Sequence, residues 1–284
     1  MYRFLNIHCP KFEWSSVHLL SCLLLGCSVF TACNPGRIRQ SADEIKETVV
    51  IGHRGFAGKY PENSEVAIRQ ALDLGVDRIE IDIRQSKDGV VLLMHDEKID
   101  RTTNGKGSVG ASTYEELRKF HLHQDDGQPT DLMAIPTLED ILRLVDARSQ
   151  LLIEIKDGND TYDRIIERTI ELVQKYDAEE WCIIQSFKDD ILEDVHRLAP
   201  NFRLHKLLLS PLFYDLDHLS FVSEFSVYHS FVNQGLIKRI HQRGKKINIW
   251  TVNKGVKMEK YLKAGIDGII TDRPDILLQI LKRK

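Results

Sequence analysis

The feature that most constrains this chain is the alternation, from residue 48 onward, of short β-branched runs with longer amphipathic stretches. Strands that alternate with helices favour repeated β-α units and a parallel sheet. The strand-like runs span residues 49–53, 78–83, 90–95, 151–156, 182–187, 203–209, 225–228, 247–252 and 268–271. Helical patterns lie between most of them, for example at residues 64–74, 137–146, 162–175, 188–198 and 254–263. The sequence therefore predicts an α/β domain.

Nine strand-like runs are one too many for an eight-stranded barrel, and the spacing shows which run is extra. Only residues 84–89 separate the second run from the third, and they contain Asp88 and Gly89. That connection is too short for a parallel crossover but suits a hairpin turn, so residues 90–95 should fold back beside the second strand. The other eight runs predict a TIM (β/α)8 barrel, a fold of about 250 residues. Residues 96–136 show little periodicity and are interpreted as a small insertion over the barrel mouth.

The N-terminal residues are typical of an export signal. Arg3 and Lys11 precede an apolar run at residues 19–32, which is shorter than the roughly 20 residues that span a bilayer. Residues 29–33 resemble the lipobox of bacterial lipoproteins. That resemblance implies a signal peptide at 1–32, lipid on Cys33, a tether at 33–47 and a domain at 48–284. An uncleaved membrane anchor or plain secretion remain the alternatives.

The charge balance points away from nucleic acid as a partner. The chain has 39 Lys and Arg against 42 Asp and Glu, a formal net charge of -3 at pH 7. Nucleic-acid-binding domains need a clustered basic surface, which the sequence does not show. No protein partner is evident from the sequence either. If residues 1–32 are removed and Cys33 carries lipid, Cys182 has no partner for an intrachain disulfide.

Three acidic side chains are expected to meet inside the barrel mouth. Residues two apart in a strand share a face, so Glu80 and Asp82 point one way while the intervening isoleucines point outward. Glu154 lies in the next barrel strand and faces the same interior. Catalytic groups of TIM barrels lie at the carboxyl ends of strands. Buried carboxylates need a cation or a proton, and oxygen ligands favour Mg²⁺ or Ca²⁺. Ion pairs with Arg54 and Lys156 are the alternative.

The polar motifs at the strand ends follow the order of a known enzyme family. They are His53-Arg54-Gly55, Pro61-Glu62-Asn63-Ser64, Glu80-Ile81-Asp82, His95-Asp96, Arg101-Thr102-Thr103, Ile153-Glu154-Ile155-Lys156, Trp250-Thr251-Val252-Asn253 and Thr271-Asp272-Arg273-Pro274. Together they resemble the glycerophosphodiester phosphodiesterase family over about residues 48–281, with Ser64 where Thr is usual. The resemblance implies a metal-dependent hydrolase that releases glycerol 3-phosphate and an alcohol from a small glycerophosphodiester.

The resemblance also implies roles for single residues. His53 and His95 would be the acid–base pair, since histidine titrates near neutrality. Arg54 and Lys156 would contact phosphate, because fixed cations stabilise charge on phosphoryl oxygens. The mechanism implied is attack by the substrate's own 2-hydroxyl, through a cyclic phosphate.

Four further residues each have a second interpretation. Glu62 and Asn63 would orient substrate or complete the outer shell of the metal, while Asn63 or Ser64 could instead cap a helix. Phe187 and Trp250 would contact the carbon skeleton of the substrate, although filling the core is the default for such residues.

Three other interpretations stay open. His121 and His123 could bind metal, but a solvated loop is the simpler interpretation of that polar segment. A related activity with similar motifs is phospholipase D-like cleavage of lysophospholipid or sphingomyelin. The last alternative is a non-catalytic barrel that only binds a ligand or partner. Retention of both histidines and all three carboxylates argues against the non-catalytic barrel.

The lipobox resemblance makes a prediction about location. Changing Cys33 to Ser should release the protein from membranes, because a lipid anchor contributes roughly 0.8 kcal/mol per buried CH₂. Fractionation of cells into membrane and soluble parts measures the effect. A variant that stays with the membrane in the same form would indicate an uncleaved anchor.

Overall fold

The computed structural model describes residues 48–123, 129–158 and 162–283. The predicted signal peptide, Cys33 and the tether all lie outside the described residues. Within the described part of the chain, no helix combines the length and apolar character needed to cross a membrane.

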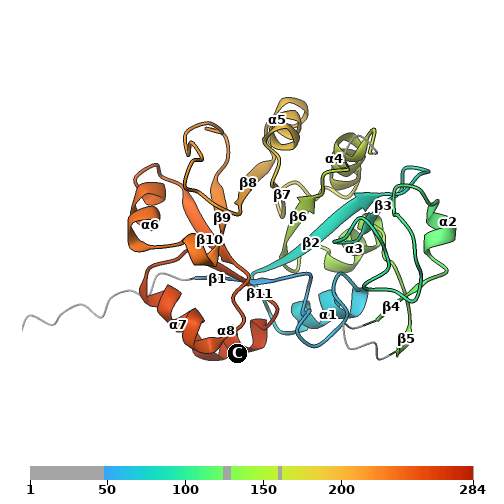
Figure 1. Cartoon of the computed structure of the whole chain (residues 1–284), viewed down its shortest axis with the longest axis horizontal. Coiled ribbons are helices and arrows are strands. Elements are labelled where there is room, and N and C mark those ends of the chain that lie inside the picture. The colour runs from blue at the N-terminus through green and yellow to red at the C-terminus, as the bar shows by residue number, and fades with distance from the viewer. Residues whose placement is uncertain (1–47, 124–128, 159–161, 284) are drawn as a thin grey trace, which may run out of the picture. The chain divides into compact units, whose positions relative to one another are not determined.

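Eight parallel strands close into a barrel, as the sequence predicts (Figure 1). In spatial order they are β1 (Val49–Gly52), β2 (Arg78–Gln85), β6 (Gln150–Ile155), β7 (Cys182–Ser186), β8 (Arg203–Leu208), β9 (Glu224–Tyr228), β10 (Lys246–Trp250) and β11 (Gly268–Thr271). Pairing of β1 with both β11 and β2 completes the ring. The fold is therefore a TIM barrel.

The predicted hairpin is also present. β3 (Val91–Leu93) runs antiparallel to the end of β2, with Ile83 opposite Leu93. The turn between them has Gly89 at φ 85°, a left-handed conformation that glycine adopts without a Cβ penalty. The extra strand therefore pairs with the end of β2 that continues past its pairing with β6.

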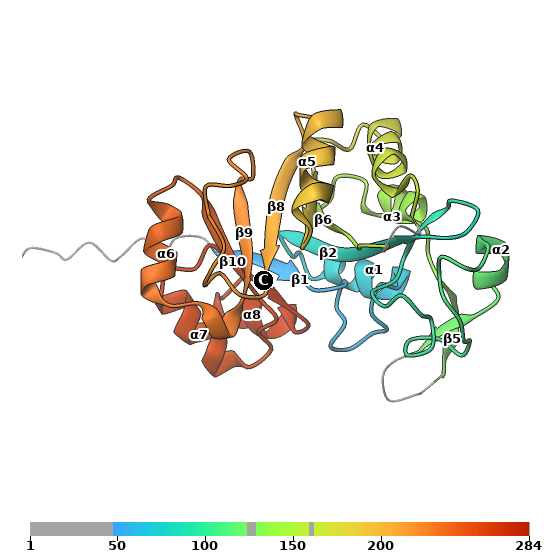
Figure 2. The same ribbon diagram turned by 45° about the horizontal axis from the view of Figure 1, so that its top comes forward.

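Helices surround the barrel (Figure 2). They are α1 (Glu65–Asp73), α3 (Leu138–Val145), α4 (Ile165–Lys175), α5 (Asp189–Leu198), α6 (Gln234–His241), α7 (Gly255–Lys263) and α8 (Pro274–Ile280). The outward side chains of the strands, such as Ile79, Ile81 and Ile83, pack into one large apolar core with these helices. This burial leaves alternate residues, Glu80 and Asp82 among them, facing the barrel interior.

The insertion after β3 has its own small core. It contains α2 (Tyr114–Leu117), β4 (His121–His123) and β5 (Pro129–Ala134), and its buried residues include Leu92, Ile99, Leu117 and Leu122. The interpretation of the segment around His121 and His123 as a solvated loop was wrong, because β4 pairs with β5. Among the described residues, neither histidine belongs to a group that could hold a metal ion.

The barrel interior alternates polar and apolar layers. Ile51, Leu152, Ile183 and Ile270 form an apolar cluster across the middle. At the amino ends of the strands, Arg78 donates two hydrogen bonds to Glu224, of 2.8 and 3.0 Å, and both residues are buried. The floor of the barrel is thus an ion pair, whereas its middle is apolar.

The buried ion pair makes a stability prediction. Glu224→Ala leaves the Arg78 guanidinium buried without its carboxylate, so the free energy of unfolding should fall by about 3–5 kcal/mol. Urea denaturation measures this change in the free energy of unfolding. The matched control is Asp217→Ala, which removes a solvent-exposed pair with Arg243 and should change the free energy of unfolding far less, because solvent screens such pairs. Equal losses in the two variants would contradict the prediction.

Candidate active site

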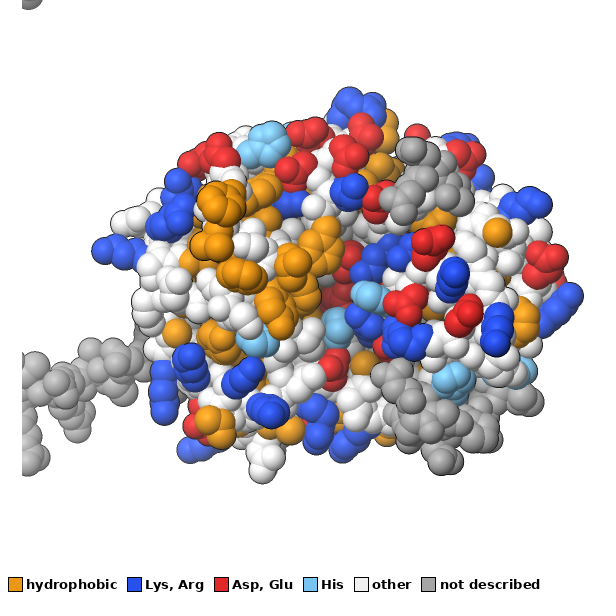
Figure 3. Space-filling view, viewed as in Figure 1, with side chains coloured by type: hydrophobic (Ala, Val, Ile, Leu, Met, Phe, Trp, Pro, Cys, Tyr) orange, Lys and Arg blue, Asp and Glu red, His pale blue; other side chains and the backbone are white. Residues whose placement is uncertain are grey.

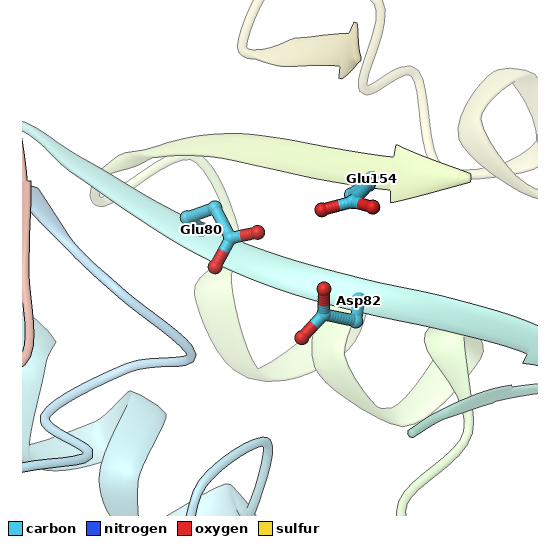
Figure 4. Close-up of side chains that lie close together, drawn as sticks. All are labelled: Glu80, Asp82 and Glu154. Atoms are coloured by element: carbon cyan, nitrogen blue, oxygen red, sulfur yellow. The ribbon is translucent and has the colours of Figure 1, made fainter. Parts of the chain in front are cut away.

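Three carboxylates meet at the carboxyl end of the barrel interior (Figure 4). Glu80 and Asp82 come from β2 and Glu154 from β6, where Asp82 is the register partner of Glu154. All three are buried, and each offers an oxygen within 4.8 Å of the others. Three oxygen ligands at this spacing, on rigid neighbouring strands, fit a single hard divalent cation.

The pKa values of these acids show the cost of bringing them together. Burial, reinforced by the charges of Asp82 and Glu154, raises the pKa of Glu80 well above its usual range. Burial likewise raises the pKa of Glu154 to about 7. Burial also acts on Asp82, but the charges of Lys156 and Arg54 outweigh it and lower its pKa well below the usual range. Without a cation, the cluster therefore holds protons near neutral pH.

Lys156 and Arg54 supply the positive charge at this site. The Lys156 Nζ lies 2.8 Å from Asp82 and 2.5 Å from Glu154. The Arg54 Nε lies 3.1 Å from Asp82, and its Nη1 donates to Glu62 over 2.8 Å. The ion pairs considered as an alternative to a metal site are thus present. They involve the same carboxylates that would hold the ion, so the two arrangements share one set of residues.

Both predicted catalytic histidines lie in the same pocket, and each is oriented by a carboxylate. His53 Nδ1 lies 2.5 Å from Asp272 Oδ1, and His95 Nδ1 lies 2.7 Å from Asp96 Oδ1. A carboxylate at Nδ1 fixes the ring and leaves Nε2 to exchange a proton. The Nε2 of His53 is 4.0 Å from Glu80, at the edge of the acidic cluster.

The pKa values around the histidines follow from burial and nearby charge. Burial lowers the pKa of His95, and the charges of Lys156 and Arg54 add to this while Asp82 opposes it. Burial raises the pKa of Asp272, but its hydrogen bond with His53 and the charge of that ring produce a net lowering. Asp272 is therefore held as the anion that His53 needs as a partner.

Glu62 and Asn63 support the site from outside the pocket that the histidines share. Asn63 is buried; its Nδ2 donates to Asp82 over 2.9 Å, and its Oδ1 accepts from the Asp82 backbone N–H over 3.1 Å. Glu62 binds Arg54 and Arg101. Neither residue lines the pocket, so both lie behind the groups that do. Ser64 caps α1 by accepting from the Ala67 N–H, which confirms that alternative for Ser64.

The pocket has about 330 Å³ of empty space, including its open mouth. Phe187 and Trp250 form one wall and contact each other edge to face, with centroids 5.5 Å apart. The remaining lining residues are His53, Arg54, Glu80, His95, Glu154, Lys156, Gln185, Leu207 and Ile270. The structure therefore gathers both histidines, the two cations and two of the three acids around one cavity with an aromatic wall.

Sequence reasoning left several supporting residues unassigned. Asp272 and Asp96 orient the histidines, and Arg101 donates to both Asp96 and Glu62. Asn253 donates to Asp272, and Gln185 donates to Glu80 over 3.3 Å. Their position at strand ends or beside a histidine was the available signal. The partners of Asp272 and Gln185, however, lie 219 and 105 positions away in the sequence.

Taken together, the fold and the site define a class of enzyme. A TIM barrel with a buried oxygen-ligand cluster, two carboxylate-held histidines and fixed cations suits hydrolysis of an anionic ester. Cations disperse the charge of the reacting group, and the histidines transfer protons. Comparison with known proteins agrees with this class.

The chain matches the glycerophosphoryl diester phosphodiesterase family over residues 53–276. A glycerophosphodiester phosphodiesterase of Caldanaerobacter subterraneus subsp. tengcongensis is 36% identical over 241 residues, covering 84% of this chain and 99% of the relative. One from Bacillus altitudinis is 34% identical, covering 82% and 98%. This chain therefore belongs to the glycerophosphoryl diester phosphodiesterase family and is an enzyme of that type.

Solved structures agree on the fold. A glycerophosphodiester phosphodiesterase from Agrobacterium tumefaciens superposes with a TM-score of 0.70 at 26% identity, covering 82% of this chain and 100% of that one. A phosphodiesterase from Oleispira antarctica, solved with its product sn-glycerol-3-phosphate, has a TM-score of 0.77 at 23% identity, covering 82% and 96%.

The acidic cluster makes a prediction about pH. The pKa of Glu154 is about 7 in the folded protein and about 4.3 in an unfolded chain. Folding without a cation therefore takes up protons at pH values between these two pKa values. The free energy of unfolding falls as the pH rises through this range. A cation competes with those protons. The rise in melting temperature caused by Mg²⁺ or Ca²⁺ should thus grow between about pH 5 and about pH 8.

Thermal melts with and without each cation measure this rise. Glu154→Gln removes the titrating group, so in that variant the cation should stabilise less and with a weaker pH dependence. A stabilisation independent of pH in the unchanged protein would contradict the assignment of Glu154 as a ligand.

Proposed function

We propose that this enzyme hydrolyses glycerophosphodiesters to glycerol 3-phosphate and an alcohol in the pocket between His53 and His95. The observation that carries the proposal is the convergence of two carboxylate-held histidines and an acidic cluster in one pocket. Relatives named glycerophosphodiester phosphodiesterase that align over most of the chain support the substrate class.

We also propose that Glu80, Asp82 and Glu154 hold one divalent cation, Mg²⁺ or Ca²⁺. The support is their all-oxygen donor set, their mutual spacing and the raised pKa values of Glu80 and Glu154, which indicate an excess of buried negative charge. When bound, such a cation supplies electrostatic stabilisation of phosphoryl oxygens. Arg54 and Lys156 line the same pocket and would add fixed positive charge.

The substrate's own 2-hydroxyl is the proposed nucleophile. One histidine takes the proton of this hydroxyl, and the other protonates the departing alcohol. An internal attack gains a large effective molarity, up to about 10⁵–10⁸ M for well-oriented groups. Water then opens the cyclic phosphate. The aromatic wall of Phe187 and Trp250 offers an apolar surface to the carbon skeleton of the glycerol.

The location of the enzyme is a separate proposal. The apolar run at residues 19–32 and the lipobox-like residues that end at Cys33 support an exported lipoprotein held at a membrane surface. The expected partners are thus a small glycerophosphodiester and a lipid bilayer.

The proposed function predicts a metal-dependent release of alcohol. Glycerophosphocholine should be cleaved to choline, and EDTA should abolish turnover until Mg²⁺ or Ca²⁺ is added. His53→Ala or His95→Ala should lower kcat by about 10²–10⁴-fold, the usual contribution of a general acid or base. An enzymatic choline assay measures both effects. Circular dichroism is the control for folding, and full turnover in EDTA would refute the metal assignment.

The same assay tests the nucleophile. An analogue that lacks only the 2-hydroxyl should bind as a competitive inhibitor and not be cleaved. Water that attacks phosphorus directly has no need of this hydroxyl. Cleavage of the analogue at a rate near that of the parent would therefore exclude the internal route and leave the histidines to activate water.

A further inference from the structure

Positive charge is concentrated in the last part of the chain, which forms one side of the barrel. Residues 229–284 contain 13 Lys and Arg against 4 Asp and Glu, whereas residues 48–228 contain 21 against 34. The overall balance, on which the expectation of no clustered basic surface depended, conceals this separation. Figure 3 shows Lys and Arg side chains on the lower left, where α7 and α8 lie in Figure 1, and Asp and Glu side chains along the top, near α5.

Six exposed cations on this side form what we call the basic face. They are Lys238, Arg239, Lys246, Lys257, Lys260 and Lys263. Among the described residues, none of the six has a carboxylate as an ion-pair partner. Cations at the ends of other helices are paired: Arg143 and Lys175 each lie 2.7 Å from Glu139. Arg197 lies 2.6 Å from Asp194. The basic face is therefore a surface whose charge is not neutralised by the fold itself.

Hydrogen bonds hold the elements of the basic face together. Gln234, at the start of α6, donates to the Ala264 carbonyl, just after the end of α7, over 3.1 Å. The Nε2 of His241, at the end of α6, lies 2.7 Å from the Asp267 carboxylate. The same carboxylate accepts the backbone N–H of Ile247 in β10 over 2.9 Å. The helices α6 and α7 thus present their cations as one surface.

Helix capping does not account for this arrangement. Cations in the last turn of a helix favour its negative end, which explains Arg239 in α6 and Lys263 in α7. Lys257, however, lies in the first turn of α7, where the helix end is positive and a cation is unfavourable. Lys260 is three residues from both Lys257 and Lys263, so like charges are neighbours on the helix surface and repel. The chain therefore keeps this charge at a cost in stability, which indicates a binding surface.

The described chain begins beside the basic face. The backbone N–H of Val49 donates to the Asp267 carbonyl over 2.8 Å, four residues after Lys263. The expected tether, residues 33–47, spans at most about 50 Å when fully extended. A lipid on Cys33 would therefore keep the basic face within reach of a bilayer, where even a weak attraction acts at a high effective concentration. Such an attraction is screened by salt, so the lipid remains the stable anchor.

We propose that the basic face docks on the surface of a bilayer that contains anionic lipid. Lys ammonium groups are attracted to the phosphates of the lipid head groups at close range. Val256, 84% exposed and next to Lys257, adds an apolar side chain that the bilayer interface can bury. The acidic side of the barrel is repelled from the same surface, so docking also orients the enzyme. The inference goes beyond the proposed function, because none of the pocket residues takes part in it.

Sedimentation with vesicles tests the proposal. The purified full chain is mixed with vesicles of phosphatidylcholine, alone or with phosphatidylglycerol, at about 0.01 M and about 1 M salt, where charges are screened beyond about 30 Å and about 3 Å. At low salt, Lys257→Gln/Lys260→Gln/Lys263→Gln should weaken binding to the anionic vesicles on the order of 100-fold, about fivefold per charge. At high salt the two proteins should bind alike. The N-terminal segment is the same in both, so its own affinity for lipid cancels.

A matched control variant removes the same number of charges elsewhere. Lys98, Lys106 and Lys119 are exposed in the insertion and, among the described residues, likewise have no ion-pair partner. Lys98→Gln/Lys106→Gln/Lys119→Gln should bind anionic vesicles as the unchanged protein does. Circular dichroism checks that both variants fold, and turnover of glycerophosphocholine should be unchanged in the α7 variant.

Four outcomes would overturn the proposal. Equal losses of binding in the two variants indicate a general effect of net charge, and equal binding of the unchanged protein to anionic and neutral vesicles removes the charge dependence. Tighter binding to duplex DNA than to anionic vesicles, lost in the α7 variant, assigns the basic face to nucleic acid. Salt-sensitive self-association that the α7 variant abolishes assigns it to the acidic side of a second copy.

The vesicle experiment is independent of catalysis. Vesicle binding as expected without turnover of glycerophosphocholine would overturn the proposed function alone. Turnover without charge-dependent binding to vesicles would overturn this inference alone.

Discussion

The buried contact between three carboxylates and two cations is the constraint on which the site depends. Two acids on β2 and one on β6 share the barrel interior, and their mutual repulsion and desolvation raise the pKa values of Glu80 and Glu154. Lys156 and Arg54 offset part of this cost. Such a cluster is a poor source of stability, because apolar residues of similar volume would fill the space at lower cost. Its presence in the mouth therefore fits the proposed binding of a cation better than a role in folding.

The apolar interior confines that charge to one end of the barrel. Ile51, Leu152, Ile183 and Ile270 separate the acidic cluster from the Arg78–Glu224 pair at the floor. Each charged layer thus has its own counterions, Lys156 and Arg54 at the mouth and Arg78 at the floor. This separation lets the mouth exchange protons or a cation with solvent while the floor remains a fixed part of the fold.

The sequence was sufficient where local periodicity carries the information. The period of two in β2 and β6 placed Glu80, Asp82 and Glu154 on the interior, and the short turn at 84–89 identified the hairpin. It was insufficient where partners are distant: Asp272 meets His53 across 219 positions. Nor did periodicity show that Asn63 would bond to Asp82, or that the polar segment around His121 would form a strand. Those outcomes depend on tertiary packing, which a local pattern does not encode.

Closure of the barrel is what turns these separate residues into a site. The His53 backbone N–H donates to the Thr271 carbonyl over 2.9 Å, so the joining of the first and last strands brings His53 beside Asp272. His95 takes its partner from the adjacent residue, but Arg101 ties that partner to Glu62, which in turn binds Arg54. One histidine is thus set by the ring of strands and the other by the insertion. Because Arg54 adjoins His53, these ion pairs link the two supports, and the relative position of the histidines depends on the insertion being docked as well as on the barrel being closed.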